Sequence, residues 1–111
     1  MILTANKHNA LLDKFLTCIN ETRFYDAHEA IETIWFKRRF EDCDEMRLLK
    51  GFINSAVSFE LRKRGRVSQS KRVWQNYLKY RPLLDTINSV HVDKYHHIAL
   101  HVETLHKRYI S

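Results

Sequence analysis

The stretch FYDAHEAIETIW, residues 24–35, places three side chains capable of chemistry close together among apolar residues. They are His28, Glu29 and Glu32. A neutral imidazole beside carboxylates can bind a divalent metal, or act as a general base whose pKa depends on burial and neighbouring charge. His28 and Glu32 are four positions apart, so on a helix the carboxylate can hold the ring and fix its tautomer. This stretch is therefore the first candidate for a functional site.

A helical wheel separates the three side chains by depth. At about 100° per residue, His28 lies on the apolar stripe, Glu32 at its border and Glu29 on its flank. The stripe consists of Phe24, Ile31 and Trp35. Because a buried polar group without a partner costs about 1–3 kcal/mol, we expect partners from another helix. The expected partners are Asn54 and Ser58.

Apolar residues recur every three or four positions along most of the chain, which holds only two glycines and one proline. This pattern predicts an all-α protein, a small bundle of four to five helices. Predicted N-caps are Asn6 or Thr4 for the first helix, Asp44 for the third and Ser68 or Ser70 for the fourth. The expected helices span about 6–19, 25–40, 45–64, 68–84 and 92–109.

The third predicted helix is apolar nearly all round, so we expect it at the centre of the bundle. Its small residues Gly51, Ser55 and Ser58 are spaced by four and three positions. They form a ridge against which a neighbouring helix can come close. Gly65 follows a cationic last turn and is predicted to end this helix. In the fourth helix, the expected core residues are Val73, Trp74, Tyr77 and Leu78.

A chain of 111 residues is long enough for one domain with a real core, and we treat residues 1–111 as one. It shows neither a signal peptide pattern nor an apolar run of membrane-spanning length, so we expect no membrane contact and a soluble, cytoplasmic protein. Cys18 and Cys43 lie far apart without metal-site spacing, and we expect two reduced thiols.

The opening stretch, followed by KGFINSAVSFELRKRG, resembles a family of small helical proteins called domain of unknown function 309. The resemblance covers about residues 22–80. The matching positions are Phe24 or Tyr25, Asp26, His28, Glu29, Glu32, Trp35, Gly51, Phe52, Ile53, Asn54, Ala56 and Gly65. Asn54 stands where the family has Gln. The resemblance implies a small all-α bundle, and it implies no particular activity.

Three interpretations of the His/Glu cluster remain open. We favour a structural polar network that fixes the register of the second and third helices. The second interpretation is a small-molecule pocket, with the candidate residues His28, Glu29, Glu32, Trp35 and Asn54. The third is a divalent metal site, for which the candidate ligands are His28, Glu32, Glu103 and His106. His97 and His101 are also four apart, and we expect them on a solvated face.

The net charge of +6 comes entirely from the second half of the chain. Its densest segment, residues 62–72, holds six cations and no acid: Arg62, Lys63, Arg64, Arg66, Lys71 and Arg72. Such a segment can bind phosphate groups or RNA. Since cations are also favoured at a helix C-terminus, we favour a solvated basic turn over a nucleic-acid footprint.

Two functional hypotheses follow. The favoured one is a non-enzymatic domain that binds a partner or ligand and that can also form a homodimer through a helix face. The alternative is a small hydrolase-like or metal-dependent enzyme that uses His28, Glu29 and Glu32. A cleft that reaches His28 and Glu29 favours the enzyme, whereas closure of the cluster by Trp35 and Phe24 favours the binding domain.

Overall fold

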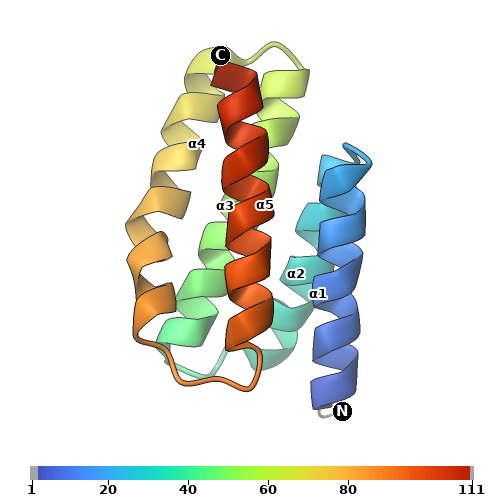
Figure 1. Cartoon of the computed structure of the whole chain (residues 1–111), viewed down its shortest axis with the longest axis vertical. Coiled ribbons are helices and arrows are strands. Elements are labelled where there is room, and N and C mark those ends of the chain that lie inside the picture. The colour runs from blue at the N-terminus through green and yellow to red at the C-terminus, as the bar shows by residue number, and fades with distance from the viewer. Residues whose placement is uncertain (1–2, 111) are drawn as a thin grey trace.

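A computed structural model gives the fold of residues 3–110, which form a bundle of helices (Figure 1). Within this range there are five α-helices, one short 3-10 helix and no strand. The elements are α1 (Ala5–Asn20), α2 (Phe24–Arg38), α3 (Asp44–Lys63), α4 (Val67–Tyr80), η1 (Arg81–Asp85) and α5 (Val92–Ile110). The all-α prediction is confirmed. No helix in residues 3–110 has both the length and the apolar character needed to cross a bilayer.

The first helix begins as predicted, whereas the third does not. The Thr4 hydroxyl accepts a hydrogen bond from the Lys7 amide at 3.1 Å and so caps α1. At α3 the N-cap is Cys43, so the prediction of Asp44 is wrong by one residue. Asp44 is instead the first residue of the helix, where the helix dipole stabilises its negative charge. Its carboxylate also accepts a hydrogen bond from Arg47 at 3.0 Å.

The α3 helix ends at a glycine, as predicted. Gly65 has a φ of +80°, a left-handed conformation that most side chains disfavour. Its amide donates to the Arg62 carbonyl at 3.0 Å, and the Arg66 amide donates to the Leu61 carbonyl at 2.9 Å. These two bonds form a Schellman motif, which satisfies the last carbonyls of α3 and turns the chain into α4.

The α4 helix packs on the predicted ridge of small residues in α3. A Cβ atom added to Gly51 would lie only 3.1 Å from the Cβ of Tyr80. Farther along, the buried hydroxyls of Ser58 and Ser70 each donate to the other's carbonyl oxygen at 2.8 Å. The ridge therefore lets two backbones approach closely and exchange hydrogen bonds.

The predicted start of α4 is wrong, because the helix begins at Val67 with Arg66 as its N-cap. Neither Ser68 nor Ser70 caps it, and the Ser70 hydroxyl serves the contact with α3 instead. The predicted core stripe of α4 holds for Trp74 and Tyr77, which are buried, but not for Leu78, which is exposed.

The core consists of aromatic and aliphatic side chains gathered around α3. Phe52 lies at its centre and contacts the rings of Phe15, Tyr77 and Tyr95, with ring centroids 6.0–6.3 Å apart. All four rings are buried. The α3 helix thus occupies the central position predicted for it, packed against both α2 and α4.

Candidate functional site

The α2 helix holds the predicted site, but its buried face differs from the predicted one. The buried residues of α2 are Phe24, Ala27, Ala30, Ile31 and Ile34. This face is rotated by roughly a quarter turn from the stripe centred on His28 and Trp35. The His28 side chain is 24% exposed, so its predicted place in the middle of the buried stripe is wrong. The reason is that the small residues Ala27 and Ala30 pack closely, whereas the larger Trp35 stays at the border.

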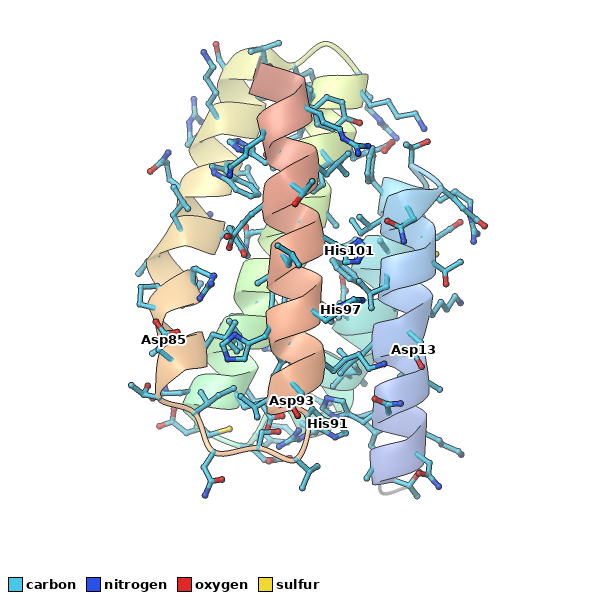
Figure 2. All side chains as sticks on the ribbon, in the orientation of Figure 1. Asp13, Asp85, His91, Asp93, His97 and His101 are labelled. Atoms are coloured by element: carbon cyan, nitrogen blue, oxygen red, sulfur yellow. The ribbon has the colours of Figure 1, made fainter. Side chains whose placement is uncertain are left out.

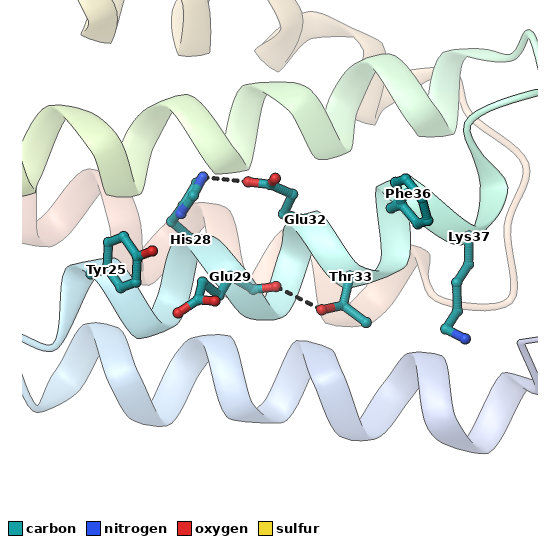
Figure 3. Close-up of a pocket in the computed structure, with 7 residues that line it drawn as sticks. All are labelled: Tyr25, His28, Glu29, Glu32, Thr33, Phe36 and Lys37. Atoms are coloured by element: carbon teal, nitrogen blue, oxygen red, sulfur yellow. Dashed lines mark hydrogen bonds and ion pairs between the residues drawn. The ribbon is translucent and has the colours of Figure 1, made fainter.

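Within the cluster, the predicted pairing of His28 with Glu32 is confirmed. His28 Nε2 lies 2.5 Å from Glu32 Oε2 (Figure 3), and the Glu32 side chain is 53% exposed. The Glu29 side chain is also exposed and has no hydrogen-bond or ion-pair partner among residues 3–110. Because the pair is open to solvent, the cluster is not the buried network that the wheel predicted.

The expected partners on α3 bind elsewhere. Asn54 donates to the Lys50 carbonyl at 2.7 Å and accepts from Asn76 of α4 at 3.2 Å. Ser58 is bonded to Ser70 of α4. Both side chains therefore point to α4 and not to α2, so the predicted register network between α2 and α3 is wrong. Trp35 is partly buried, with Lys50 Nζ 5.3 Å from its ring centroid.

Two shallow hollows meet at Tyr25 and His28. The first, about 290 Å³, follows the outer face of α2 and is drawn in Figure 3. The second, about 260 Å³, lies between the start of α2 and the end of α3. We call this second hollow the His28 groove, and it is lined by Phe24, Tyr25, His28, Val57, Glu60, Leu61, Arg64 and Arg66.

The His28 groove brings together residues that the sequence placed in separate groups. Arg64 bonds Glu60 at 3.2 Å. The guanidinium group of Arg66 has no hydrogen-bond or ion-pair partner in the described part of the chain. Sequence reasoning missed this meeting of His28 with two arginines. The sequence did contain a signal for this meeting. Two helices joined by a short loop run antiparallel, so the start of α2 lies beside the end of α3.

The other cations of residues 62–72 do not share one surface. Lys63 donates to the Thr22 carbonyl at 3.1 Å, toward the α1–α2 turn. The charge of Arg62 acts on His106 of α5, whose pKa is lowered first by burial and then by this charge. Lys71 and Arg72 are exposed on α4. The basic segment therefore splits into groups that face different ways.

The candidate metal ligands do not gather. Glu103 accepts hydrogen bonds from Tyr77 at 2.5 Å and Arg81 at 2.7 Å. The His106 ring stacks on Trp74 with centroids 3.8 Å apart. His28 and Glu32 lie on a different helix, and residues 3–110 contain no group of three or more metal-binding side chains.

The last helix carries the second histidine pair. His97 and His101 lie on the side of α5 that faces α1, with ring centroids 4.6 Å apart (Figure 2). His97 is exposed and His101 is half-buried, so the predicted solvated face holds fully for only the first.

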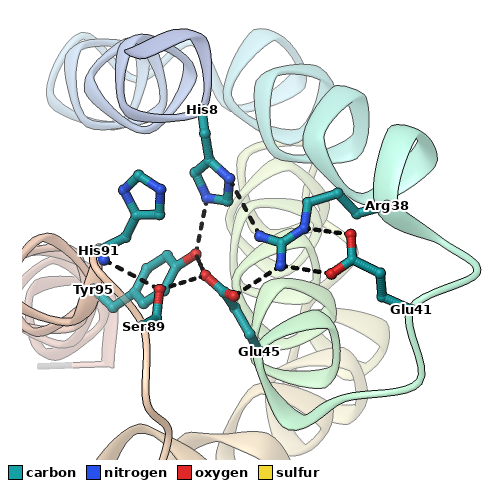
Figure 4. Close-up of polar contacts among 7 residues, drawn as sticks. All are labelled: His8, Arg38, Glu41, Glu45, Ser89, His91 and Tyr95. Carbon is teal, nitrogen blue, oxygen red and sulfur yellow. Dashed lines mark hydrogen bonds and ion pairs between the residues drawn. The ribbon is translucent and has the colours of Figure 1, made fainter. Parts of the chain in front are cut away.

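A second polar cluster, which the sequence analysis missed, lies at the opposite end of α2 (Figure 4). We call it the His8 cluster; it comprises His8, Arg38, Glu41, Glu45, Ser89, His91 and Tyr95. The Glu45 carboxylate accepts from Tyr95 at 2.6 Å, from Ser89 at 2.7 Å and from Arg38 at 3.0 Å. Arg38 also donates two bonds of 2.8 Å to Glu41.

The hydrogen bonds assign one tautomer to His8. Since the Tyr95 hydroxyl donates to Glu45, its oxygen accepts from His8 Nε2 at 2.9 Å. The bare Nδ1 atom then faces Arg38 at 3.4 Å. Burial, the stacked His91 ring 3.9 Å away and the Arg38 charge together lower the pKa of His8 to about 4. His8 is therefore neutral at pH 7.

The other titratable groups of the His8 cluster respond to the same contacts. Burial alone would raise the pKa of Glu45, but hydrogen bonds from Tyr95, Ser89 and Arg38 hold it below its usual value. Burial and the bond to Glu45 raise the pKa of Tyr95. A signal for this cluster existed, because His8, Leu12, Phe15 and Ile19 share helical spacing and His8 thus continues a core stripe.

The comparisons with known proteins identify the family. No curated protein and no solved structure matches the chain. The family model described as "Domain of unknown function (DUF309)" matches residues 12–73, which is more than half of the chain. This range contains the whole His/Glu cluster and the Gly65 turn, as the resemblance implied. The chain therefore belongs to the DUF309 family.

Proposed function

We propose that this protein is a binding domain whose His28 groove takes a small organic anion, a carboxylate or phosphate attached to an apolar group. One observation carries the proposal. His28, Arg64 and Arg66 line one open hollow, although they come from different helices and turns. The guanidinium group of Arg66 has no partner within residues 3–110.

The polar groups of the groove favour an anion. A guanidinium presents several N–H donors in a plane and suits carboxylate and phosphate oxygens. Arg64 donates a hydrogen bond from Nε to the Glu60 carboxylate at 3.2 Å, and this bond orients the guanidinium. The other N–H groups of Arg64 are left for a ligand. His28 Nε2 is bound to Glu32, so the two guanidinium groups are the donors that remain for an anion.

The walls of the groove favour a ligand that is small and partly apolar. Phe24, Val57 and Leu61 supply apolar surface, and Tyr25 supplies a ring at the mouth. The volume of about 260 Å³ is slightly below the usual range for ligand pockets, which is about 300–1,000 Å³. A single ring or a short aliphatic chain that bears one acidic group fits this space.

The surroundings count against a nucleic acid. Single-stranded nucleic acids are bound by exposed aromatic side chains along a continuous basic path. Here Trp74 and Tyr77 are buried, and the cations of residues 62–72 face different ways.

The test is a titration of the labelled protein with benzoate, followed by NMR. We expect shifts at His28, Tyr25 and Arg66, and weaker shifts with benzyl alcohol, which has the same ring and no charge. Arg66→Gln should weaken benzoate binding at least fivefold, while the matched variant Arg72→Gln should leave it unchanged. Equal binding of benzoate and benzyl alcohol, or loss in both variants alike, contradicts the proposal.

A second candidate function, general-base catalysis, is favoured by one observation. The imidazole of His28 lies 2.5 Å from the Glu32 carboxylate, and an open hollow reaches both His28 and Glu29. This satisfies the accessibility criterion set for the enzyme. The test is the rate of p-nitrophenyl acetate hydrolysis by His28→Ala, compared with the exposed-histidine control His96→Ala. A tenfold fall in the first alone supports catalysis, and equal rates contradict it.

A further inference from the structure

The outer face of α2 exposes an unusual amount of aromatic surface. We define this face as Tyr25, Glu29, Thr33, Phe36 and Lys37, with Phe40 directly beyond the helix. Tyr25 is 59% exposed, Phe36 57% and Phe40 88%. These are the large aromatic side chains that count as exposed among residues 3–110. Aromatic side chains gathered on one exposed face are typical of an interaction surface.

The charges on this face follow an order along the helix. Glu29 lies in the first half of the helix, and Lys37 lies in its last turn. The helix dipole favours this order, but it does not account for the aromatic side chains. Within residues 3–110, neither the Glu29 carboxylate nor the Lys37 ammonium has an ion-pair partner.

We propose that the outer face of α2 binds the same face of a second copy of this chain, in antiparallel orientation about a two-fold axis near Thr33. Glu29 and Lys37 are each four residues from Thr33, so this symmetry places each Glu29 opposite Lys37 of the second copy. It also places Tyr25 near the Phe40 end of the second copy. The face is complementary to itself in charge and brings its aromatic residues into contact.

A parallel pairing does not have this complementarity. It would set Glu29 against Glu29 and Lys37 against Lys37, and like charges across an interface disfavour association. One helix of 15 residues is about 22 Å long, so the contact is small. We therefore expect a dimer in rapid exchange that forms at high protein concentration. Neither Arg64 nor Arg66 takes part, so this inference does not rest on the proposed ligand.

The test is analytical ultracentrifugation of the whole chain between about 10 μM and 1 mM. The expected mass rises with concentration from 13.4 kDa toward twice that value. Glu29→Lys alone and Lys37→Glu alone should each weaken dimerisation about tenfold or more. Lys71→Glu, a charge reversal away from this face, should leave it unchanged.

Mixing the two variants gives the decisive result. In a pair made of one Glu29→Lys chain and one Lys37→Glu chain, both cross-contacts again join opposite charges. We therefore expect the equimolar mixture to dimerise as the wild type does. The proposal is overturned if the wild-type protein is monomeric at every concentration, or if the mixture of the two variants stays monomeric. Circular dichroism checks that each variant is folded.

Discussion

The His8 cluster and the His28 groove contain the same kinds of residue, yet they have opposite characters. Each has a histidine near carboxylates and arginines. In the His8 cluster, His8 is only 2% exposed and Glu45 accepts three hydrogen bonds. In the His28 groove, the guanidinium group of Arg66 has no hydrogen-bond or ion-pair partner among residues 3–110. Residue type alone therefore does not decide the role of such a cluster. The partners that other segments contribute decide it.

The source of those partners explains the difference. The His8 cluster joins α1, α2, α3, α5 and the loop before α5, so His8, Arg38, Glu45 and Tyr95 find partners as the helices pack (Figure 4). The His28 groove lies at the edge of two helices, where nothing in residues 3–110 covers it. We therefore expect the first cluster to determine stability and the second to determine binding.

The largest expected effect is that of Glu45→Ala. Removing this carboxylate leaves Tyr95, Ser89 and Arg38 without their shared acceptor in a partly buried site. Arg38 keeps its two bonds to Glu41, so we expect a cost of about 3–4 kcal/mol in all. The free energy of unfolding, measured with urea, should fall by this amount. The matched control Glu32→Ala should cost less than about 1 kcal/mol. Equal losses of unfolding free energy in the two variants would contradict the distinction between the His8 cluster and the His28 groove.

The next effect is the loss of stability in acid. His8 has a folded pKa of about 4 and an unfolded pKa near 6.5, so the unfolded chain binds more protons between these values. Stability from this residue is therefore present above pH 6.5 and is lost as pH falls to 4, by about 3 kcal/mol. His8→Gln should flatten the curve of unfolding free energy against pH in this window. His96→Gln, a change at an exposed histidine, should not flatten it.

A smaller effect is expected from Tyr95→Phe, which keeps the ring and removes only the hydroxyl. Glu45 then loses one donor and His8 Nε2 loses its acceptor, which should cost about 1–3 kcal/mol. Thermal unfolding measures the change. If the variant is as stable as the wild type, the hydrogen-bond chain from His8 to Glu45 does not hold the helices together.

Much of the fold could be predicted from local sequence. Gly65 needs only its own φ to end α3, and Gly51 and Ser58 need only their small size to admit α4. The rotation of α2 was not predictable in this way. A helical wheel gives most weight to large residues such as Trp35. In the folded chain, the buried face of α2 instead contains the small residues Ala27 and Ala30. That choice depends on the surfaces of α1 and α3.

The candidate site was predicted in part for the same reason. The His28–Glu32 contact lies within one helix, so its spacing alone was sufficient. The arginines of the groove and the partners of His8 come from other segments, and a single sequence does not show which segments meet. Asn54 and Ser58 were misassigned because their spacing fits a buried face but does not say which neighbour that face meets.

The contrast between a stabilising His8 cluster and a binding His28 groove is tested most directly by the free energy of unfolding of His28→Ala, measured with urea at pH 7. His28 is partly exposed and its contact with Glu32 lies on the surface, where such pairs contribute about 0.5 kcal/mol. We predict a loss of less than about 1 kcal/mol. A loss of 3 kcal/mol or more would show that His28, like Glu45, belongs to the scaffold and would contradict the assignment of the groove to binding.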